Sequence, residues 1–332
     1  MKKSSWFLLT SGGLLSLLLV VVVGGGIFRY VTSERRLMRE GEQYLLQKNY
    51  PKALEVYTEL VRLHPKSAAA YSGRGTVYFR CRQYDAAIAE YSQAIALSRR
   101  EDSKTTCYVS RGVCYDSEGK WGAAADDFTG AIAIDPKRWN AYRLRGRDYS
   151  RLKRFNQALD DANEAIELKP NSAECYATRA IINAEAGQRV MAEADCAKLT
   201  EMNPNSYLVW NNAGWAMYLL NELPEAVRYD RRALELSPRA ATTRFNLALC
   251  LVLQNNAIEA NKEYAQAIAE GQTNSCIGAL RELKRLREKH PNTPAIKEAI
   301  LLFAAEEAKL KPDASPEKRE TNKKESESEN AE

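Results

Sequence analysis

The sequence predicts an all-α protein in which helical hairpins stack side by side into a solenoid. Three observations lead to this class. A tyrosine followed three residues later by arginine and then glycine recurs as "YSGRG", "YVSRG" and "YRLRG", and weakens to "YATRA". The last three copies are spaced 34 residues apart, and four of the prolines that close apolar stretches keep the same period. A fixed period of roughly 20–50 residues is typical of stacked repeat units.

The composition sets limits on the kind of function. The chain has 332 residues, of which 45% are hydrophobic and 27% charged, as in an ordinary globular protein. Its net charge of +5 is too small to predict nucleic-acid binding. The seven cysteines are scattered, with no C-x-x-C spacing, so we expect buried thiols rather than a zinc site or a disulfide framework. His64 and His290 each precede a proline at an expected helix end, which makes them poor candidates for a base or a ligand.

An apolar segment opens the chain. Residues 1–5 form a basic flank, and residues 6–31 are predicted to be a transmembrane helix. The 25 residues from Ser4 to Phe28 carry no charge, and as a helix they exceed the bilayer core of about 30 Å. Trp6 and Tyr30 lie near the ends, where amphipathic rings favour the headgroup level. The alternative is a signal sequence, cleaved or uncleaved, but its apolar region is usually about 7–15 residues long.

The orientation of this segment stays open. Basic residues flank it on both sides: Lys2 and Lys3 before it, and Arg29, Arg35, Arg36 and Arg39 after it. The larger number after the span favours a cytoplasmic repeat domain, whereas a very short basic N-terminus commonly stays inside. The scattered cysteines add weight to a reducing compartment. The sequence therefore predicts a single-pass membrane protein, with the cytoplasmic side favoured.

Counting back from the prolines divides the following region into seven repeats. Their bounds are 34–67, 68–104, 105–138, 139–172, 173–206, 207–240 and 241–274. Six are 34 residues long, and the second carries three extra residues around "RREDSK", where we expect a loop to bulge. The fourth position is large and mostly aromatic, the eighth is Gly or Ala, and the twentieth is alanine in all seven. The eleventh is tyrosine in the first four repeats.

These positions predict two helices in each repeat. The fourth, eighth and eleventh positions share one face of a first helix by the i, i+4, i+7 rule. A small residue in the middle of that face lets a second helix approach closely, and the alanine at the twentieth position is its counterpart. One hairpin cannot bury its apolar face alone, so neighbouring hairpins must stack.

The pattern resembles the tetratricopeptide repeat, whose signature is a large apolar residue, Gly and Tyr, followed by Ala, an aromatic residue and a terminal Pro. The resemblance covers residues 34–274 in seven copies that keep the same phase. It implies a right-handed superhelical solenoid whose first helices line a concave groove. It also implies a protein-binding scaffold rather than an enzyme. Residues 275–310 are expected to form capping helices, and the charged residues 311–332 a disordered tail.

The recurring arginine occupies the seventh position of repeats two to five, and an acid follows sixteen residues later. We predict a ladder of ion pairs within the repeats: Arg74–Glu90, Arg111–Asp127, Arg145–Asp161 and Arg179–Asp195. A partly buried guanidinium needs a partner, and a carboxylate can accept its planar fork. The alternative interpretation is a basic binding stripe.

A partner site is predicted on the concave positions of repeats six and seven. It comprises Leu208, Asn211, Asn212, Trp215, Tyr218, Phe245, Asn246 and Leu249. The sixth position is asparagine in both repeats, and such paired amides could hold an extended peptide backbone. The alternative is that Trp215 and Phe245 pack against the capping helices.

Repeat four offers a second candidate, a cluster for an acidic ligand formed by Asn140, Arg143, Arg147 and Arg151. Some tetratricopeptide domains bind chaperone tails with a Lys/Asn/Arg carboxylate clamp spread over three repeats. Neighbouring repeats here do not supply such a spread, so this match is incomplete. An RNA- or DNA-binding role for these arginines is the other alternative, which the small net charge disfavours.

The sequence contains no phosphate-binding loop, metal-ligand cluster or nucleophile motif. We therefore expect no catalytic residues, no metal and no cofactor. The prediction is a non-enzymatic scaffold tethered to a membrane, whose groove binds a peptide or helix of another protein.

Overall fold

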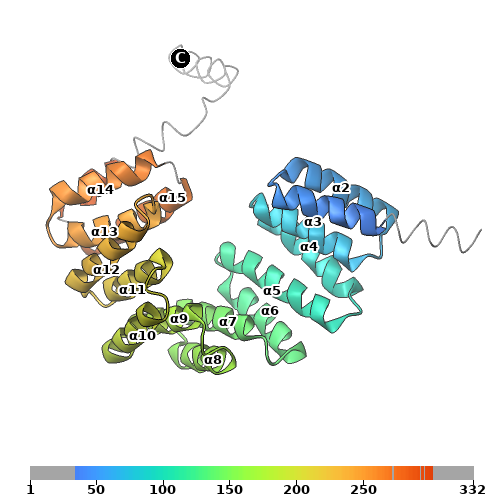
Figure 1. Ribbon diagram of the computed structural model, residues 1–332, viewed down its shortest axis with the longest axis horizontal. Coiled ribbons are helices and arrows are strands. Elements are labelled where there is room, and N and C mark those ends of the chain that lie inside the picture. The colour runs from blue at the N-terminus through green and yellow to red at the C-terminus, as the bar shows by residue number, and fades with distance from the viewer. Residues whose placement is uncertain (1–33, 271–272, 292, 295, 302–332) are drawn as a thin grey trace, which may run out of the picture. The chain divides into compact units, whose positions relative to one another are not determined.

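The computed structural model describes residues 34–270, 273–291, 293–294 and 296–301 (Figure 1). Within these ranges every regular element is a helix, and the all-α class is confirmed. The predicted transmembrane helix over 6–31 and the predicted tail over 311–332 lie outside the described residues. No helix among the described residues has the length and apolar character needed to cross a bilayer.

The helices follow one another as antiparallel hairpins. A helix over residues 34–46 is followed by α2 (Tyr50–Leu63), α3 (Ala68–Arg80), α4 (Tyr84–Leu97), α5 (Glu101–Ser117), α6 (Trp121–Ile134), α7 (Trp139–Arg151), α8 (Phe155–Leu168), α9 (Ala173–Glu185), α10 (Arg189–Met202), α11 (Tyr207–Leu219), α12 (Leu223–Leu236), α13 (Ala241–Leu253), α14 (Ala257–Ala269) and α15 (Thr273–Lys289). A last helical stretch covers 296–301. Helices α3, α7, α9, α11 and α13 each begin at the first residue of a repeat as counted in the sequence.

The chain divides into two compact units, an N-terminal unit (residues 1–168) and a C-terminal unit (residues 169–332). The described part of the N-terminal unit contains repeats one to four, and its apolar core consists of several small clusters. The C-terminal unit contains repeats five to seven and α15, which share one large apolar cluster.

Small residues at the eighth position bring the two helices of a hairpin together. A Cβ added to Gly112 on α5 would lie 2.8 Å from the ring of Phe128 on α6. The alanine at the twentieth position is completely buried in all seven repeats, at Ala53, Ala87, Ala124, Ala158, Ala192, Ala226 and Ala260. Larger side chains at either place would push the helices apart.

The turn between the two helices has the same backbone form in every repeat. The fifteenth residue has a positive φ of 57° to 76° at Lys48, Arg82, Gly119, Lys153, Gly187, Asn221 and Asn255. The next residue donates its N–H to a carbonyl five residues back, for example Gln83 to Tyr78 at 2.9 Å. This is the Schellman ending of a helix, which glycine and asparagine adopt most readily.

The loop predicted at the insertion in repeat two is wrong. The extra residues are helical and lengthen α5 to 17 residues. Arg100 is its N-cap in an extended conformation, and Glu101 and Asp102 stand in the first turn. The insertion contains neither Pro nor Gly, and acidic residues in a first turn interact favourably with the helix dipole. These residues therefore lengthen the helix instead of forming a loop before it.

Candidate functional site

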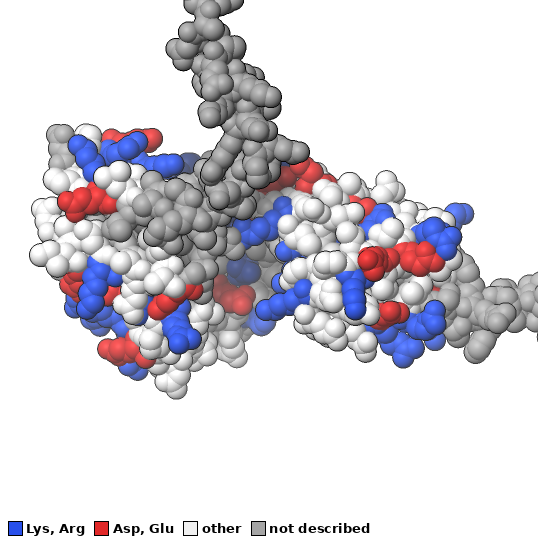
Figure 2. Space-filling model, turned by 90° about the horizontal axis from the view of Figure 1, so that it is seen from above, with Lys and Arg blue, Asp and Glu red and all other residues white. Residues whose placement is uncertain are grey.

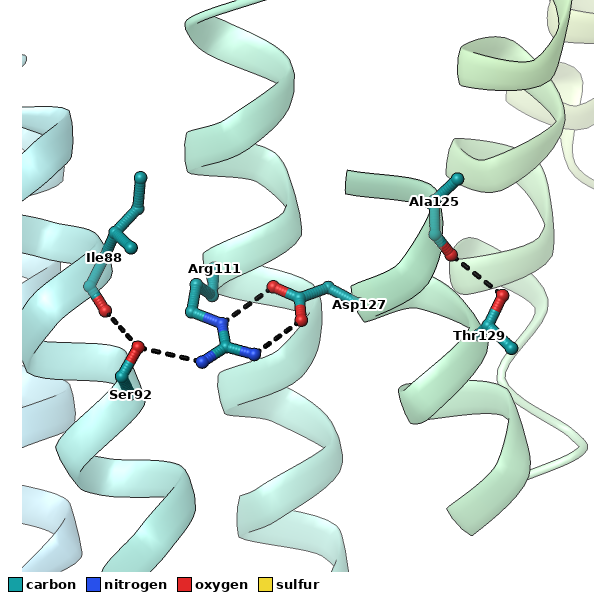
Figure 3. A network of polar contacts seen from close by, with 6 residues as sticks. All are labelled: Ile88, Ser92, Arg111, Ala125, Asp127 and Thr129. Carbon is teal, nitrogen blue, oxygen red and sulfur yellow. Dashed lines mark hydrogen bonds and ion pairs between the residues drawn. The ribbon is translucent and has the colours of Figure 1, made fainter. Parts of the chain in front are cut away.

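The structure brings the four recurring arginines to the acids predicted for them. On α5, Arg111 Nε and Nη2 donate to Asp127 Oδ2 and Oδ1 on α6, at 2.8 and 2.6 Å (Figure 3). Arg145 binds Asp161 in the same way at 2.8 and 2.7 Å, and Arg179 binds Asp195 at 3.0 and 2.7 Å. In repeat two a single hydrogen bond of 2.8 Å joins Arg74 Nη2 to Glu90 Oε1. The pairs link the two helices of each hairpin.

The structure adds a contact between successive repeats that sequence reasoning missed. Arg111 Nη1 donates to Ser92 Oγ on α4 at 2.8 Å, and that hydroxyl donates to the carbonyl of Ile88 (Figure 3). Arg145 Nη1 makes the equivalent bond to Thr129 Oγ1 at 2.9 Å. Ser92 and Thr129 both occupy the twenty-fifth position of their repeat, so a hydroxyl there was the available signal.

The tyrosine of each motif lies under the arginine. The guanidinium carbon of Arg74, Arg111, Arg145 and Arg179 stands 5.6–5.7 Å from the ring centre of Tyr71, Tyr108, Tyr142 and Tyr176. A cation over an aromatic face is attracted by the ring quadrupole. In the recurring "Y-x-x-R-G", the ring therefore contacts the guanidinium, the guanidinium binds the acid of the second helix, and the glycine lets the two helices approach closely.

A fifth ion pair lies in repeat seven, where the seventh position is not arginine. Arg244 Nη1 donates to Glu263 Oε2 at 2.6 Å, and Nη2 donates to the carbonyl of Pro238 at 2.7 Å. Arg244 stands one helical turn before the usual position, at the place of the motif's aromatic residue. The acid retained at Glu263 was the signal that repeat seven also contains a pair.

The arginines of repeat four are accompanied by acids. Arg147 and Arg151 on α7 both donate to the carboxylate of Asp116 on α5, the former at 2.6 Å. Arg151 Nη1 also lies 3.5 Å from Asp148 Oδ1. Asp116 stands at the twelfth position of repeat three, a concave position that the sequence-based search did not include. The two arginines thus join neighbouring repeats, and an acidic ligand would have to compete with Asp116.

Burial shapes the titration of this cluster. Asp148 is completely buried, and desolvation raises the pKa of its carboxyl to about 7 in spite of Arg147 nearby. Desolvation also lowers the pKa of Arg147. The other two predicted members, Asn140 and Arg143, lie on the same helix, with Arg143 5.9 Å from the ring of Trp139. The cluster is a network of mixed charge within the repeats.

The partner site predicted in repeats six and seven divides into an open and a covered part. On α11, Leu208 is 55% exposed, and Asn211, Asn212 and Trp215 are half-buried. The remaining predicted residues are buried: Tyr218 on α11, and Phe245, Asn246 and Leu249 on α13. Leu208, Asn212 and Trp215 are called the repeat-six surface below.

The two asparagines at the sixth position do not form a pair. Asn246 Nδ2 donates instead to Asn211 Oδ1 at 3.2 Å, and Thr243 Oγ1 donates to the same oxygen at 2.9 Å. Within the described part of the chain, the side chain of Asn212 makes no hydrogen bond. Asn212 therefore keeps both its donor and its acceptor for a ligand.

The N-terminal unit has a groove that sequence reasoning missed. It has a volume of about 600 Å³ and lies among the helix over 34–46, α3 and α5. Its floor consists of the small residues Ala69, Ser72, Gly73 and Thr76 of α3, at the concave positions of repeat two. The small residues at these four positions were the signal in the sequence.

Basic and acidic side chains are interspersed over the face shown in Figure 2. In the described ranges, no group of three or more His, Cys, Asp or Glu side chains is arranged to hold a metal ion.

Comparison with known proteins relates the chain to one repeat family. Residues 39–102 match the family model described as tetratricopeptide repeat. Among curated relatives, the mitochondrial import receptor subunit TOM70 of Rattus norvegicus is 31% identical over 87 residues, which are 26% of this chain and 14% of that protein. The human DnaJ homolog subfamily C member 7 is 28% identical over 102 residues, 31% of this chain and 20% of that protein. The chain thus spans only a small part of the relatives it matches.

Solved structures show the same fold. A tetratricopeptide repeat protein from Parabacteroides merdae superimposes with a TM-score of 0.64 at 17% identity, covering 82% of this chain and 99% of that one. Yeast Tom70 superimposes with a TM-score of 0.54 at 16% identity, covering 83% of this chain and 62% of that one.

Proposed function

Because this chain is a tetratricopeptide-repeat protein, we propose that it is a non-enzymatic scaffold that binds a segment of another protein on the concave side of its repeats. In this proposal a single-pass helix over residues 6–31 tethers the scaffold to a membrane, and the repeats carry the specificity. The tether rests on the uncharged stretch of the sequence alone.

The observation that carries the binding role is the repeat-six surface. Leu208 and Trp215 leave apolar area open to solvent, and Asn212 stands beside them with its amide uncommitted. Apolar area provides affinity, whereas an amide that both donates and accepts can bind a peptide backbone. All three side chains project from one helix whose position is fixed by the large core of the C-terminal unit.

The relatives agree with a role in handling other proteins. One is a subunit of a mitochondrial import receptor, and another is a DnaJ homolog. Since the chain matches only short parts of them, their partners are not transferred to it. The partner proposed here is defined by chemistry alone, as a peptide or helix that presents apolar side chains.

The arginines of repeat four favour neither an acidic chaperone tail nor a nucleic acid as the ligand. Arg147 and Arg151 already share the carboxylate of Asp116. A ligand phosphate or carboxylate would have to replace Asp116. The free energy of binding would therefore gain only the difference between the new ion pairs and the existing ones.

In-cell crosslinking followed by pull-down of the full-length protein tests the binding role. A variant with Trp215→Ala and Asn212→Ala removes the repeat-six surface. The matched control changes two exposed apolar residues of the same unit, Val190→Ala and Ile258→Ala, which are 74% and 89% exposed. Circular dichroism checks that both variants keep the helix content of the wild type.

We expect a partner that wild type and control capture equally and that the Trp215/Asn212 variant captures at least about tenfold less, as the loss of one hot-spot residue can produce. Equal capture by all three proteins would refute the proposed site. The tether is tested separately by alkaline extraction of membranes. The full-length protein is expected in the membrane pellet, and its quantitative release into the supernatant would contradict the anchor.

A further inference from the structure

Helix α15 does not continue the packing pattern of the repeats. Within each compact unit the first helix of a repeat packs extensively on the second helix of the preceding repeat, as α5 does on α4, α7 on α6 and α13 on α12. Among the described residues, helix α15 contacts α13 more than it contacts α14. It is therefore displaced from the place that the first helix of an eighth repeat would take.

The displacement brings α15 across α13 to α11. Tyr218 on α11 donates its hydroxyl to Glu282 Oε1 on α15 at 2.7 Å, although 64 residues separate them. Tyr218 stands at the twelfth position of repeat six, one of the concave positions. Helix α15 thus lies over the concave side of repeat seven instead of extending the row of first helices.

The apolar face of α15 covers the predicted partner groove. Ala279, Leu283 and Leu286 follow the i, i+4, i+7 spacing and are buried in the same cluster as Phe245 and Leu249. Phe245 and Leu249 are each only 2% exposed, whereas Leu208 on the neighbouring α11 stays open. One half of the groove that the sequence assigned to a partner is therefore occupied by the chain itself.

The opposite face of α15 is polar and basic. Its exposed residues include Arg281, Lys284, Arg285, Arg287 and Lys289. The helix is thus amphipathic, and its form is that of a ligand laid into a hydrophobic groove. The fit is incomplete at its C-terminal end, where a cavity of about 160 Å³ lies between Tyr218 and Leu253 on one side and Leu286 and Lys289 on the other.

We propose that α15 is an internal occupant of the partner groove and that the partner is an amphipathic helix of the same pattern, which displaces it. The pattern is Ala, Leu and Leu at i, i+4 and i+7, with a carboxylate at i+3 for the Tyr218 hydroxyl. The inference rests on the proposed function, because it identifies the kind of partner that binds in that groove. The repeat-six surface is the open edge from which such a helix begins to bind.

A labelled peptide with the sequence of residues 273–290 is the probe. Its binding to the full-length protein in detergent micelles is measured by fluorescence anisotropy. The variant Leu283→Asp places a charge in the apolar face of α15 and should release the helix, since burying an unpaired carboxylate is unfavourable. We expect this variant to bind the peptide at least about tenfold more tightly than wild type, where α15 occupies the groove.

Two controls define the interaction. A peptide carrying the same Leu283→Asp change should not bind to the opened protein, because its apolar face is broken. Glu282→Gln in the protein weakens the bond to Tyr218, together with the exposed ion pair to Arg285 on the same helix, and should increase peptide affinity by a few-fold. Hydrogen exchange over α9 to α14 reports whether the groove persists in each variant.

Two results would overturn the proposal. In the first, the amides of the groove stay protected from hydrogen exchange in the Leu283→Asp variant, and the peptide does not bind. Helix α15 is then a fixed cap that a second helix cannot replace. If protection of α11 and α13 collapses when α15 is released, the groove does not exist without it. Neither result affects the Trp215-dependent capture in cells. Conversely, partner capture in cells that does not depend on Trp215, together with intact peptide binding in vitro, would refute only the proposed binding role in cells.

Discussion

The carboxyl group of Asp230 on α12 lies against the backbone of Gly214 on α11, so closely that a Cβ on Gly214 would be 2.4 Å from Asp230 Oδ1. Asp230 occupies the twenty-fourth position, which holds an aromatic ring in repeats one, two, three and seven. It is completely buried, and neither oxygen has a hydrogen-bond partner among the described residues. Repeat six therefore replaces a packed ring with a buried acid.

The first prediction concerns the pH dependence of stability. Burial raises the pKa of Asp230 well above its ordinary value, and the neighbouring thiol of Cys250 is uncharged because burial raises its pKa as well. A raised folded-state pKa gives stability that is fully present below the unfolded pKa of about 4 and is lost as pH rises towards the folded value. Asp230→Asn should therefore stabilise the C-terminal unit more at pH 7 than at pH 4.5.

Urea unfolding of wild type and Asp230→Asn at both pH values measures this difference. The control is Asp126→Asn on an exposed position of α6, which should shift the midpoint little at either pH. An Asp230→Asn effect that is the same at pH 4.5 and pH 7 would show that the acid is not held neutral by burial.

The second prediction concerns the space that Gly214 leaves. Gly214→Ala should destabilise the protein by about 1–3 kcal/mol, because the added methyl overlaps Asp230 and lies 3.4 Å from the carbonyl of Ala226. The matched control is Gly122→Ala in α6, where a Cβ meets nothing within 4 Å. That change should be neutral or stabilising by up to about 1 kcal/mol, as helix propensity requires. Thermal unfolding compares them, and equal shifts for both would contradict the role of close approach.

The third prediction concerns the turn residue with positive φ. Arg82 adopts a φ of 62°, where its Cβ is strained, and the equivalent residue of repeat three is Gly119. Arg82→Gly should stabilise the protein by about 0.5–1 kcal/mol, because relief of the left-handed conformation outweighs the added freedom of the unfolded chain. Gly119→Arg should destabilise it by about as much. Denaturant midpoints check the pair, and a destabilising Arg82→Gly would disprove the argument.

The helices and their internal pairs could be predicted because each depends on one repeat alone. The period fixes where α13 begins, and the register within a hairpin places Asp161 opposite Arg145. These features repeat, so each copy supports the others. The same reasoning assigned Leu208 and Trp215 to concave positions of an ordinary repeat, and their role in binding stays a prediction.

What could not be predicted depends on contacts between repeats or on segments without the period. Asp116 binds arginines of the next repeat, and a search confined to single hairpins does not reveal it. Helix α15 lacks the repeat signature, so counting positions could not show that it crosses to Tyr218. The inserted residues at the start of α5 are helical because their local sequence favours a helix. The prediction of a loop relied instead on the expected boundary between repeats.

The fourth prediction concerns the ion-pair ladder. Arg145→Ala should destabilise the protein by about 2 kcal/mol, because it leaves the buried carboxylate of Asp161 without its two donors. Asp161→Ala should cost no more than this, since the guanidinium keeps its bond to Thr129 and its place over Tyr142. The corresponding change in repeat two, Arg74→Ala, should cost less, because a single hydrogen bond joins Arg74 to Glu90.

A double-mutant cycle of Arg145→Ala and Asp161→Ala in urea isolates the coupling between the two side chains. Burial raises the pKa of Asp161, whereas the hydrogen bond from Arg145 lowers it, so removal of the arginine should shift the titration of this carboxyl upwards. Arg145→Ala should therefore lose less stability at pH 4 than at pH 7, because the unpaired acid is protonated there. A coupling near zero, or a loss that does not change with pH, would mean that the ladder is not held together by these pairs.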